Sequence, residues 1–282
     1  MSAVKDGTLY LCATPIGNLE DITIRVLRVL KECDLIAAED TRHTRKLLAH
    51  YDIHTPLTSY HAHNEQKKGE KLLEKLKQGQ SVALVTDAGM PGISDPGLEI
   101  VQMALEQGVA VVPVPGATAG ITALVISGLP CARFAFEGFL PANKKGRRRR
   151  LEKLAGEERT MVFYESPHRL IDTLEDMYKI MGDRPVAVAR EITKKHEEVY
   201  RGNISGAIEY FKENTVKGEF TLVVSGSAAE EKENQWEDLP VADHVMQLMA
   251  AGMDKKQAIK KVARLRGLPK REVYSAVNMG NN

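Results

Sequence analysis

The clearest structural signal lies at residues 81–92, which read Ser81-Val82-Ala83-Leu84-Val85-Thr86-Asp87-Ala88-Gly89-Met90-Pro91-Gly92. The first half is a short, nearly continuous apolar run, which is typical of a strand buried on both faces of a sheet. The second half places glycine, proline and small residues directly after that strand. Ligands of parallel sheets bind beyond the carboxyl ends of the strands. The stretch therefore indicates an α/β protein with a ligand-binding loop after a buried strand.

Two further loops of this kind follow predicted strands. The loop after residues 9–14 is Thr14-Pro15-Ile16-Gly17-Asn18, and the loop after residues 109–114 is Pro115-Gly116-Ala117-Thr118-Ala119. Glycine and alanine allow a ligand to approach the backbone closely, where exposed N–H groups can bond to it. One such loop is often only a turn. Three of them on one predicted sheet indicate a ligand site at its edge.

Strand and helix signals alternate along most of the chain. In the first 120 residues we expect strands at 9–14, 34–38, 81–86 and 109–114, and helices at 22–31, 41–51, 65–78 and 97–107. Nearly continuous apolar strands separated by helices favour a parallel sheet covered on both faces. A helix at 118–127 leads to a second α/β region, whose strands are expected at 134–137, 160–164, 185–190, 197–200 and 219–225.

These patterns predict two α/β domains followed by a linker and a helical domain. The expected segments are a parallel-sheet domain at 1–121, a second α/β domain at 122–227, an acidic linker at 228–240 and a small helical domain at 241–282. The last segment carries three apolar stripes, with Asp254 as an expected N-cap. Three short helices with such turns resemble a helix-turn-helix unit. A helical cap on the main body explains the same pattern equally well.

Composition excludes several classes of protein. The chain has 282 residues, of which 43% are hydrophobic and 27% charged, and this excludes a disordered or fibrous protein. It shows no signal-peptide pattern and no apolar run long enough for a membrane helix, so we expect no membrane partner. Its three isolated cysteines indicate a reducing compartment, and we expect a cytoplasmic protein. No P-loop, dinucleotide or nucleophile-elbow motif is present. No zinc-ligand spacing is present either, so no metal is expected.

Positive charge is concentrated in two regions, although the formal net charge is only +1. One is the run at 144–150, and the other is the tail from Asp243 onward, where eight basic residues face three acidic ones. Two basic patches on a nearly neutral body indicate a localised surface for a polyanion. A solvated helix face and a soluble tail are the alternative.

Six blocks of sequence carry a resemblance to a known family. They are residues 9–23, 37–44, 59–65, 87–97, 136–141 and 163–169, the last reading Phe163-Tyr164-Glu165-Ser166-Pro167-His168-Arg169. In this order they resemble the tetrapyrrole methylase superfamily. Within it, they are most similar to bacterial enzymes that methylate a cytidine 2′-hydroxyl of small-subunit ribosomal RNA with S-adenosylmethionine. The resemblance implies the tetrapyrrole-methylase-like fold of two α/β domains with a cofactor cleft between them and a small C-terminal helical segment, usually as a homodimer.

The resemblance also implies a set of cofactor-binding residues drawn from both domains. They are Ile16, Asp87, Ala88, Gly89, Pro91, Thr118, Ala119, Phe163, Tyr164, Ala189 and Thr221. The sequence Asp87-Ala88-Gly89 departs from many relatives, which have Gly-Asp-Pro, so the residue that takes the polar role of their aspartate stays open. Phe163 and Ala189 also suit a purely structural core position, as apolar residues near strand ends usually do.

Methyl transfer depends mainly on holding the ribose oxygen in line with the sulfur and the methyl carbon. A nearby base or cation assists because a 2′-hydroxyl is a weak acid. The sequence does not single out such a group. Its candidates are Glu39, Asp40, Arg42, His43 and His168, with His61, His63 and Glu165 in the same blocks.

For an RNA substrate, the basic patches supply phosphate contacts. The candidate contacts are Lys144, Lys145, Arg147, Arg148, Arg149, Arg150, Lys255, Lys256, Lys260, Lys261, Lys270 and Arg271. Aromatic RNA-recognition signatures are missing, so a structured ribosomal RNA or the small ribosomal subunit is favoured over a short free strand. Two other functions remain open: a methyltransferase for a tetrapyrrole intermediate, and a non-catalytic RNA-binding protein on the same fold.

Overall fold

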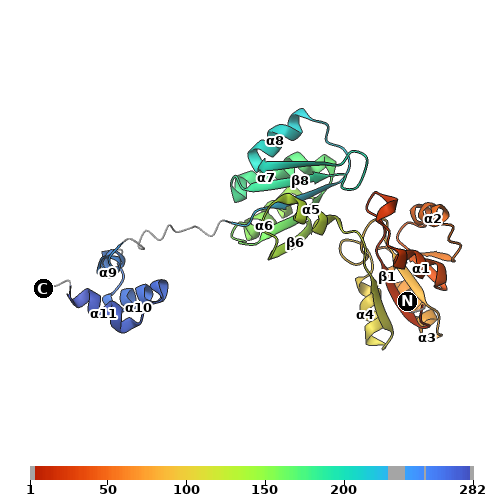
Figure 1. Cartoon of the computed structure of the whole chain (residues 1–282), viewed down its shortest axis with the longest axis horizontal. Helices are drawn as coiled ribbons and strands as arrows, with labels where there is room; N and C mark the ends of the chain where they lie inside the picture. The colour runs from red at the N-terminus through yellow and green to blue at the C-terminus, as the bar shows by residue number, and fades with distance from the viewer. Residues whose placement is uncertain (1–3, 228–238, 251, 280–282) are drawn as a thin grey trace. The chain divides into compact units, whose positions relative to one another are not determined.

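The computed structural model describes residues 4–227, 239–250 and 252–279. The chain forms two compact units, Met1–Ser227 and Ala228–Asn282 (Figure 1). The acidic linker expected at 228–240 lies outside the described residues, except for its last two positions. No helix in the described part of the chain combines the length and the apolar character that a membrane crossing requires.

The first sheet of the Met1–Ser227 unit is parallel, which confirms the prediction from the apolar runs. Its strands are β1 (Thr8–Cys12), β2 (Leu35–Ala38), β3 (Leu57–Ser59), β4 (Val82–Val85) and β5 (Ala110–Val114). They pair in the order β3-β2-β4-β1-β5, and all four pairings are parallel. β3 was not predicted, because its three half-buried residues carry no apolar pattern.

Helices cover both faces of this sheet. Neighbouring residues on a strand point to opposite faces, so Tyr10 packs into one core cluster and Leu9 into another. The first cluster includes residues of α1 (Ile24–Glu32) and α2 (Thr41–His50), and the second includes residues of α3 (Glu65–Lys77) and α4 (Leu98–Glu106). A short 3₁₀ helix, η1 (Leu19–Asp21), precedes α1. With both faces buried, the carboxyl ends of the strands are the part of the sheet that carries loops to a ligand.

The second sheet of the same unit is mixed. Its strands are β6 (Phe134–Phe139), β7 (Thr160–Glu165), β8 (Pro185–Arg190), β9 (Glu198–Asn203) and β10 (Phe220–Val224), in the order β6-β7-β10-β8-β9. Only β6 and β7 pair in parallel, and the other pairings are antiparallel. The predicted strand at 197–200 extends three residues further, to Asn203.

The two faces of the second sheet pack against different helices. One core cluster joins the sheet to α6 (Lys144–Leu154), α7 (Leu170–Met181) and α8 (Ile204–Glu213), with the 3₁₀ helix η2 (Pro167–Arg169) before α7. The other cluster joins it to α5 (Ala119–Ser127). The expected division between residues 121 and 122 therefore falls inside α5, a helix that packs on the second sheet.

The Ala228–Asn282 unit has a small core of its own. Its helices are α9 (Val241–Ala250), α10 (Lys255–Arg266) and α11 (Lys270–Met279). Their apolar stripes meet in one cluster, whose buried members are Val245, Ala258, Ile259, Val262, Ala263, Val273 and Val277. The predicted N-cap is confirmed, because the Asp254 side chain accepts hydrogen bonds from the N–H groups of Lys256 and Gln257.

Candidate active site

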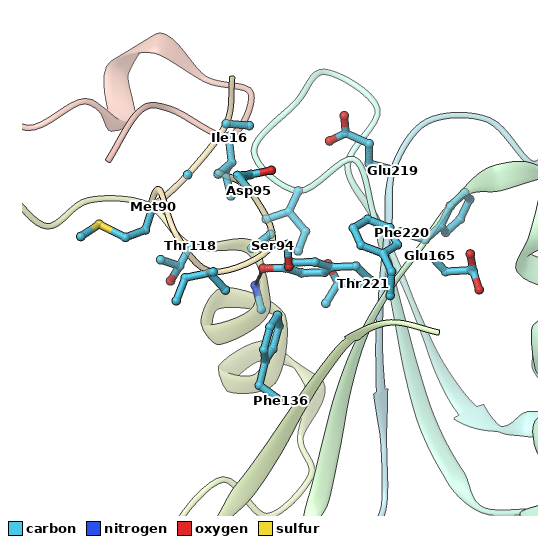
Figure 2. A pocket seen from close by; sticks show the side chains of 18 of the residues that line it. Ile16, Met90, Ser94, Asp95, Thr118, Phe136, Glu165, Glu219, Phe220 and Thr221 are labelled. Atoms are coloured by element: carbon cyan, nitrogen blue, oxygen red, sulfur yellow. Dashed lines mark hydrogen bonds between the residues drawn. The ribbon is translucent and has the colours of Figure 1, made fainter. Parts of the chain in front are cut away.

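A cavity of about 650 Å³ lies where the loops of the first sheet meet the second sheet (Figure 2). The loops that follow β1, β2, β4 and β5 contribute Ile16, Glu39, Asp87, Ala88, Gly89, Met90, Ser94, Asp95 and Thr118, and the start of α5 contributes Ala119. The second sheet contributes Phe134, Phe136, Phe139, Tyr164, Glu165, Phe220 and Thr221. All three glycine- and proline-containing loops identified in the sequence thus reach one cavity, whose size is typical of small-molecule sites.

Backbone hydrogen bonds join the loop after β1 to the loop after β4. The N–H of Thr14 donates to the carbonyl of Gly89 at 2.9 Å, and the N–H of Gly89 donates to the carbonyl of Thr14 at 3.1 Å. The Thr14 hydroxyl also donates to the carbonyl of Thr86 at 3.0 Å. Gly89 has φ +83°, a conformation that residues with a side chain rarely adopt. The loop therefore needs glycine at this position.

Most of the residues implied to bind the cofactor line this cavity. They are Ile16, Asp87, Ala88, Gly89, Thr118, Ala119, Tyr164 and Thr221. Three others do not. Pro91 is buried outside the lining, and Ala189 is a core residue at 1% exposure. Phe163 lies fully buried on the opposite face of β7 from Tyr164, because side chains alternate along a strand. Phe163 and Ala189 thus occupy the core positions that their apolar character also suggested.

Carboxylates form one side of the cavity. Glu39 accepts hydrogen bonds from the Thr86 hydroxyl at 2.6 Å and from the Asp87 N–H at 3.5 Å. Burial raises the pKa of Asp87 above its usual value, and the charge of Glu39 adds to this, whereas a hydrogen bond from the Asp40 N–H opposes it. Burial likewise raises the pKa of Asp95. These groups can attract a cation and accept hydrogen bonds from ligand hydroxyls.

Most of the residues proposed as an assisting base or cation lie away from the cavity. Asp40 is the N-cap of α2, and its hydrogen bonds with Arg42 hold its pKa well below the usual range. The side chain of Arg42 is 86% exposed. His43 and His168 are exposed as well, and neither lines the cavity. Of these five candidates, Glu39 is the one that the structure places in the described lining.

Glu165 also lines the cavity, but its carboxylate is already engaged. It accepts a hydrogen bond from the Thr173 hydroxyl at 2.6 Å and pairs with Arg169 at 3.3 Å. His61 and His63 are outside the lining. Among the described residues, no group of His, Cys, Asp or Glu side chains is arranged to hold a metal ion.

Sequence reasoning missed four aromatic residues of the cavity, Phe134, Phe136, Phe139 and Phe220. The ring centroids of Phe136 and Phe139 lie 5.2 and 5.6 Å from that of Tyr164. Tyr164 is held in place, because its hydroxyl accepts a hydrogen bond from the Gly120 N–H at 3.1 Å. The available signal was Phe136-Glu137-Gly138-Phe139, two aromatic residues flanking a glycine at the end of a strand.

The basic run on α6 is divided between the interior and the surface. Arg147 is 3% exposed and pairs with Asp176 at 2.7 Å, and Arg148 pairs with the same carboxylate. A buried guanidinium cannot reach an RNA phosphate, so the prediction of an RNA contact is corrected for Arg147. The other eleven predicted contacts remain at least partly accessible: Lys144, Lys145, Arg148, Arg149, Arg150, Lys255, Lys256, Lys260, Lys261, Lys270 and Arg271.

The chain resembles known proteins over most of its length. It matches the family model described as Tetrapyrrole (Corrin/Porphyrin) Methylases over residues 8–208. It is 54% identical to the "Ribosomal RNA small subunit methyltransferase I" of Halalkalibacterium halodurans, over 95% of this chain and 94% of that protein. The protein of the same name from Bacillus subtilis is 51% identical, over 97% and 94% of the two chains.

Solved structures support the fold. A uroporphyrin-III-C-methyltransferase from Thermus thermophilus aligns with a TM-score of 0.57 and 21% identity, covering 80% of this chain and 98% of that one. A cobalt precorrin-4 methyltransferase also aligns with a TM-score of 0.57, at 16% identity, covering 78% and 95% of the two chains. At these identities the likeness extends to the fold alone.

Proposed function

Because this chain belongs to the tetrapyrrole (corrin/porphyrin) methylase family, we propose that it is an S-adenosylmethionine-dependent methyltransferase. Its substrate is small-subunit (16S) ribosomal RNA, and the acceptor is the 2′-hydroxyl of a cytidine. The names of its relatives at 54% and 51% identity support the RNA substrate. The observation that carries the proposal is the convergence of eight expected cofactor residues from two sheets on one cavity.

The chemistry of the cavity fits S-adenosylmethionine. Its sulfonium and ammonium groups are cations, and its ribose carries hydroxyls, which suits a wall that includes Glu39, Asp87 and Asp95. Ile16 and Tyr164 supply apolar surface for the remainder of the molecule. The positive φ of Gly89 opens the backbone at this wall. When bound, S-adenosylmethionine supplies an electrophilic methyl group.

The protein's own contribution is alignment. Groups that hold a nucleophile in line with an electrophile can contribute about 7–11 kcal/mol to lowering a barrier. The described lining contains no histidine, so an imidazole base is not part of the proposal. Glu39 is the proposed proton acceptor, because its side chain lines the cavity. Its hydrogen bond from Thr86 fixes the orientation of the carboxylate.

We further propose that the protein acts in the cytoplasm as a homodimer on the assembling small ribosomal subunit. Three exposed residues of α6, Lys144, Lys145 and Arg149, supply phosphate contacts beside the cavity-lining strand β6. The exposed lysines of α10 and the first residues of α11 supply others.

Transfer of a labelled methyl group tests the function. We expect incorporation from S-adenosylmethionine into small-subunit RNA and none into uroporphyrinogen or a precorrin. Mass mapping of small-subunit RNA from cells that lack the protein should show the loss of one ribose methyl group on a cytidine. Methylation of the tetrapyrrole alone would contradict the RNA assignment. Absence of any heat of binding with S-adenosylmethionine at near-millimolar concentration would instead indicate a non-catalytic RNA-binding protein.

A further inference from the structure

Two exposed aromatic rings lie on the wall of the cavity. The exposed fractions are 38% for Phe136 and 56% for Phe139, although large aromatic side chains contribute most when they are buried. Both rings pack against Tyr164 at centroid distances of 5.2 and 5.6 Å, with interplanar angles of 74° and 59°. The three rings form one aromatic surface that is backed by protein on one side and open on the other.

A β-bulge produces this surface. Residues three apart on a regular strand face opposite sides of the sheet, so Phe136 and Phe139 would normally diverge. The register of β6 on β7 shifts between Phe136 and Gly138, which makes Glu137 an extra residue, and Gly138 has φ +61°. Bulges at sheet edges often redirect a side chain, and β6 is an edge strand. Here the bulge brings both rings to Tyr164.

Neighbouring residues hold this arrangement in place. Arg150 of α6 pairs with the bulged Glu137 at 2.5 Å. On the opposite side, Gly120 at the start of α5 leaves room for the rings, since a Cβ there would lie 3.3 Å from the Tyr164 hydroxyl and 3.4 Å from a ring atom of Phe136. Figure 2 shows Phe136 beside this helix. The aromatic surface is therefore preorganised before any ligand arrives.

Cations lie on the helix that follows. A short loop, residues 140–143, connects β6 to α6, whose Lys144, Lys145 and Arg149 are exposed. Aromatic rings combined with adjacent cations are typical of surfaces that bind unstacked bases, where the rings stack on the base and the cations contact the backbone. A tetrapyrrole substrate offers no such combination of one flat base and a line of phosphates.

We infer that Phe136 and Phe139, supported by Tyr164, stack on the base of the target nucleotide after it leaves its own stack. This stacking places the ribose of that nucleotide at the mouth of the cavity. Enzymes that modify a base commonly extrude its nucleotide into a pocket and stack the base between aromatic or apolar side chains. The inference rests on the proposed function, because it names the part of the RNA, the target base, that this same site recognises.

The test compares Phe139→Ala with Phe139→Trp and with Tyr178→Ala. Tyr178 is a 45% exposed aromatic residue of α7 outside the cavity lining, so Tyr178→Ala is the matched control. Stacking on one aromatic ring is worth about 1–3 kcal/mol, or roughly 5- to 150-fold. We expect Phe139→Ala to lower kcat/KM for small-subunit RNA by such a factor. Phe139→Trp keeps an aromatic ring at this position and should therefore retain more of the wild-type kcat/KM than Phe139→Ala. Tyr178→Ala should stay within about threefold of the wild type, a change smaller than the fivefold lower bound.

A second substrate identifies the stacked group. In this RNA the target nucleotide keeps its ribose but lacks its base. The base and the ring then form a double-mutant cycle. We expect Phe139→Ala to lower kcat/KM on the normal RNA but to have almost no effect on the RNA without the base. Calorimetry with S-adenosylhomocysteine should give the same affinity for the wild type and the variant.

Three results would overturn the inference while leaving the proposed function intact. The first is a wild-type kcat/KM in Phe139→Ala, and the second is an equal loss of kcat/KM in Phe139→Ala on both RNAs. The third is a matching loss of S-adenosylhomocysteine affinity, which would assign the ring to the cofactor. If the wild-type protein itself transfers no methyl group to small-subunit RNA, the proposed function fails, and the inference fails with it.

Discussion

Gly89 meets two requirements, a positive φ and close approach of a ligand to the backbone, and comparison with a second glycine separates them. It has φ +83° in the loop that lines the cavity, while Gly79 has φ +89° with open space around it. A side chain in the left-handed region costs about 1–2 kcal/mol. We expect Gly89→Val and Gly79→Val to lose similar stability in urea unfolding, whereas only Gly89→Val loses most of its S-adenosylhomocysteine affinity. Wild-type affinity in folded Gly89→Val would exclude close backbone approach at this loop.

The carboxyl of Asp95, a partly buried residue, should make the stability of the protein depend on pH. Burial raises the pKa of Asp95 above the unfolded value of 3.8. The folded state therefore disfavours the ionised carboxylate, and this destabilisation is fully present above the folded pKa and disappears as the pH falls through it towards 3.8. We expect Asp95→Asn to be more stable than the wild type at pH 7.

The measurement is urea unfolding of both proteins at several pH values. The stability advantage of Asp95→Asn should shrink as the pH is lowered and be absent at pH values below the unfolded pKa. An advantage that is independent of pH, or a loss of stability at neutral pH, would show that burial of the charge is not what the substitution relieves.

On helix α6, adjacent arginines have different roles. Arg147 is buried in its ion pair with Asp176, while Arg149 is exposed. Removing one partner of a buried pair costs about 3–5 kcal/mol, whereas exposed substitutions usually change stability by less than about 0.5 kcal/mol. Because Arg148 still pairs with Asp176, we expect Arg147→Ala to lose about 3 kcal/mol in urea unfolding and Arg149→Ala almost nothing. Equal losses would contradict this division.

The exposed cations of α6 are the ones to test for RNA binding. We expect the triple variant Lys144→Gln, Lys145→Gln and Arg149→Gln to keep its stability and its S-adenosylhomocysteine affinity. The slope of log RNA affinity against log salt should fall by about 0.7–0.9 for each phosphate that the variant no longer neutralises, or up to about 2.7 for three phosphates. An unchanged slope would show that this face of the helix is only solvated.

Predictability from sequence differs between the elements of the site. Continuous apolar runs identified four of the five parallel strands, and the loops after three of them identified Ile16, Gly89 and Thr118 as cavity residues. Side chains alternate along β7, so Tyr164 points to the cavity and Phe163 to the core. Sequence-based strand boundaries are uncertain by more than one residue, so they do not tell which of the two faces the cavity. No pattern in the sequence shows that Glu137 is an extra residue in β6. Simple alternation therefore places Phe136 and Phe139 on opposite faces, and the two rings were not predicted to share the cavity.

At the scale of the whole molecule, the cavity exists because two sheets that are distant in the sequence meet. The N–H of Asn18 donates to the hydroxyl of Thr193 at 3.1 Å, which joins the first loop to the turn after β8. Thr193 has φ +68°, an unusual value for a residue with a side chain. No local pattern in the sequence predicts that this turn meets that loop. The contact depends on how the finished sheets pack.

The second unit of the chain has a role that can be separated from the cavity. Its buried cluster is formed by α9, α10 and α11, and the described lining of the cavity comes from the Met1–Ser227 unit. We therefore expect a chain that ends at Ser227 to fold, to melt like the α/β unit of the full-length protein and to bind S-adenosylhomocysteine with unchanged affinity. Its RNA affinity should fall on the order of tenfold, because the basic residues of α10 and α11 are removed.

Substitutions in the full-length chain show whether charge is the cause. Lys255, Lys256, Lys260 and Lys261 are exposed on α10, outside the cluster that holds the unit together. Replacing all four by glutamine should preserve the helical content and reproduce most of the loss seen on truncation, with a salt slope smaller by about 0.7–0.9 for each phosphate left without a cation. If the truncated chain loses RNA affinity and the glutamine variant does not, the unit acts through surfaces other than these lysines. If neither protein loses affinity, the three helices do not hold the RNA, and the cations of α6 beside the aromatic surface carry the phosphate contacts alone.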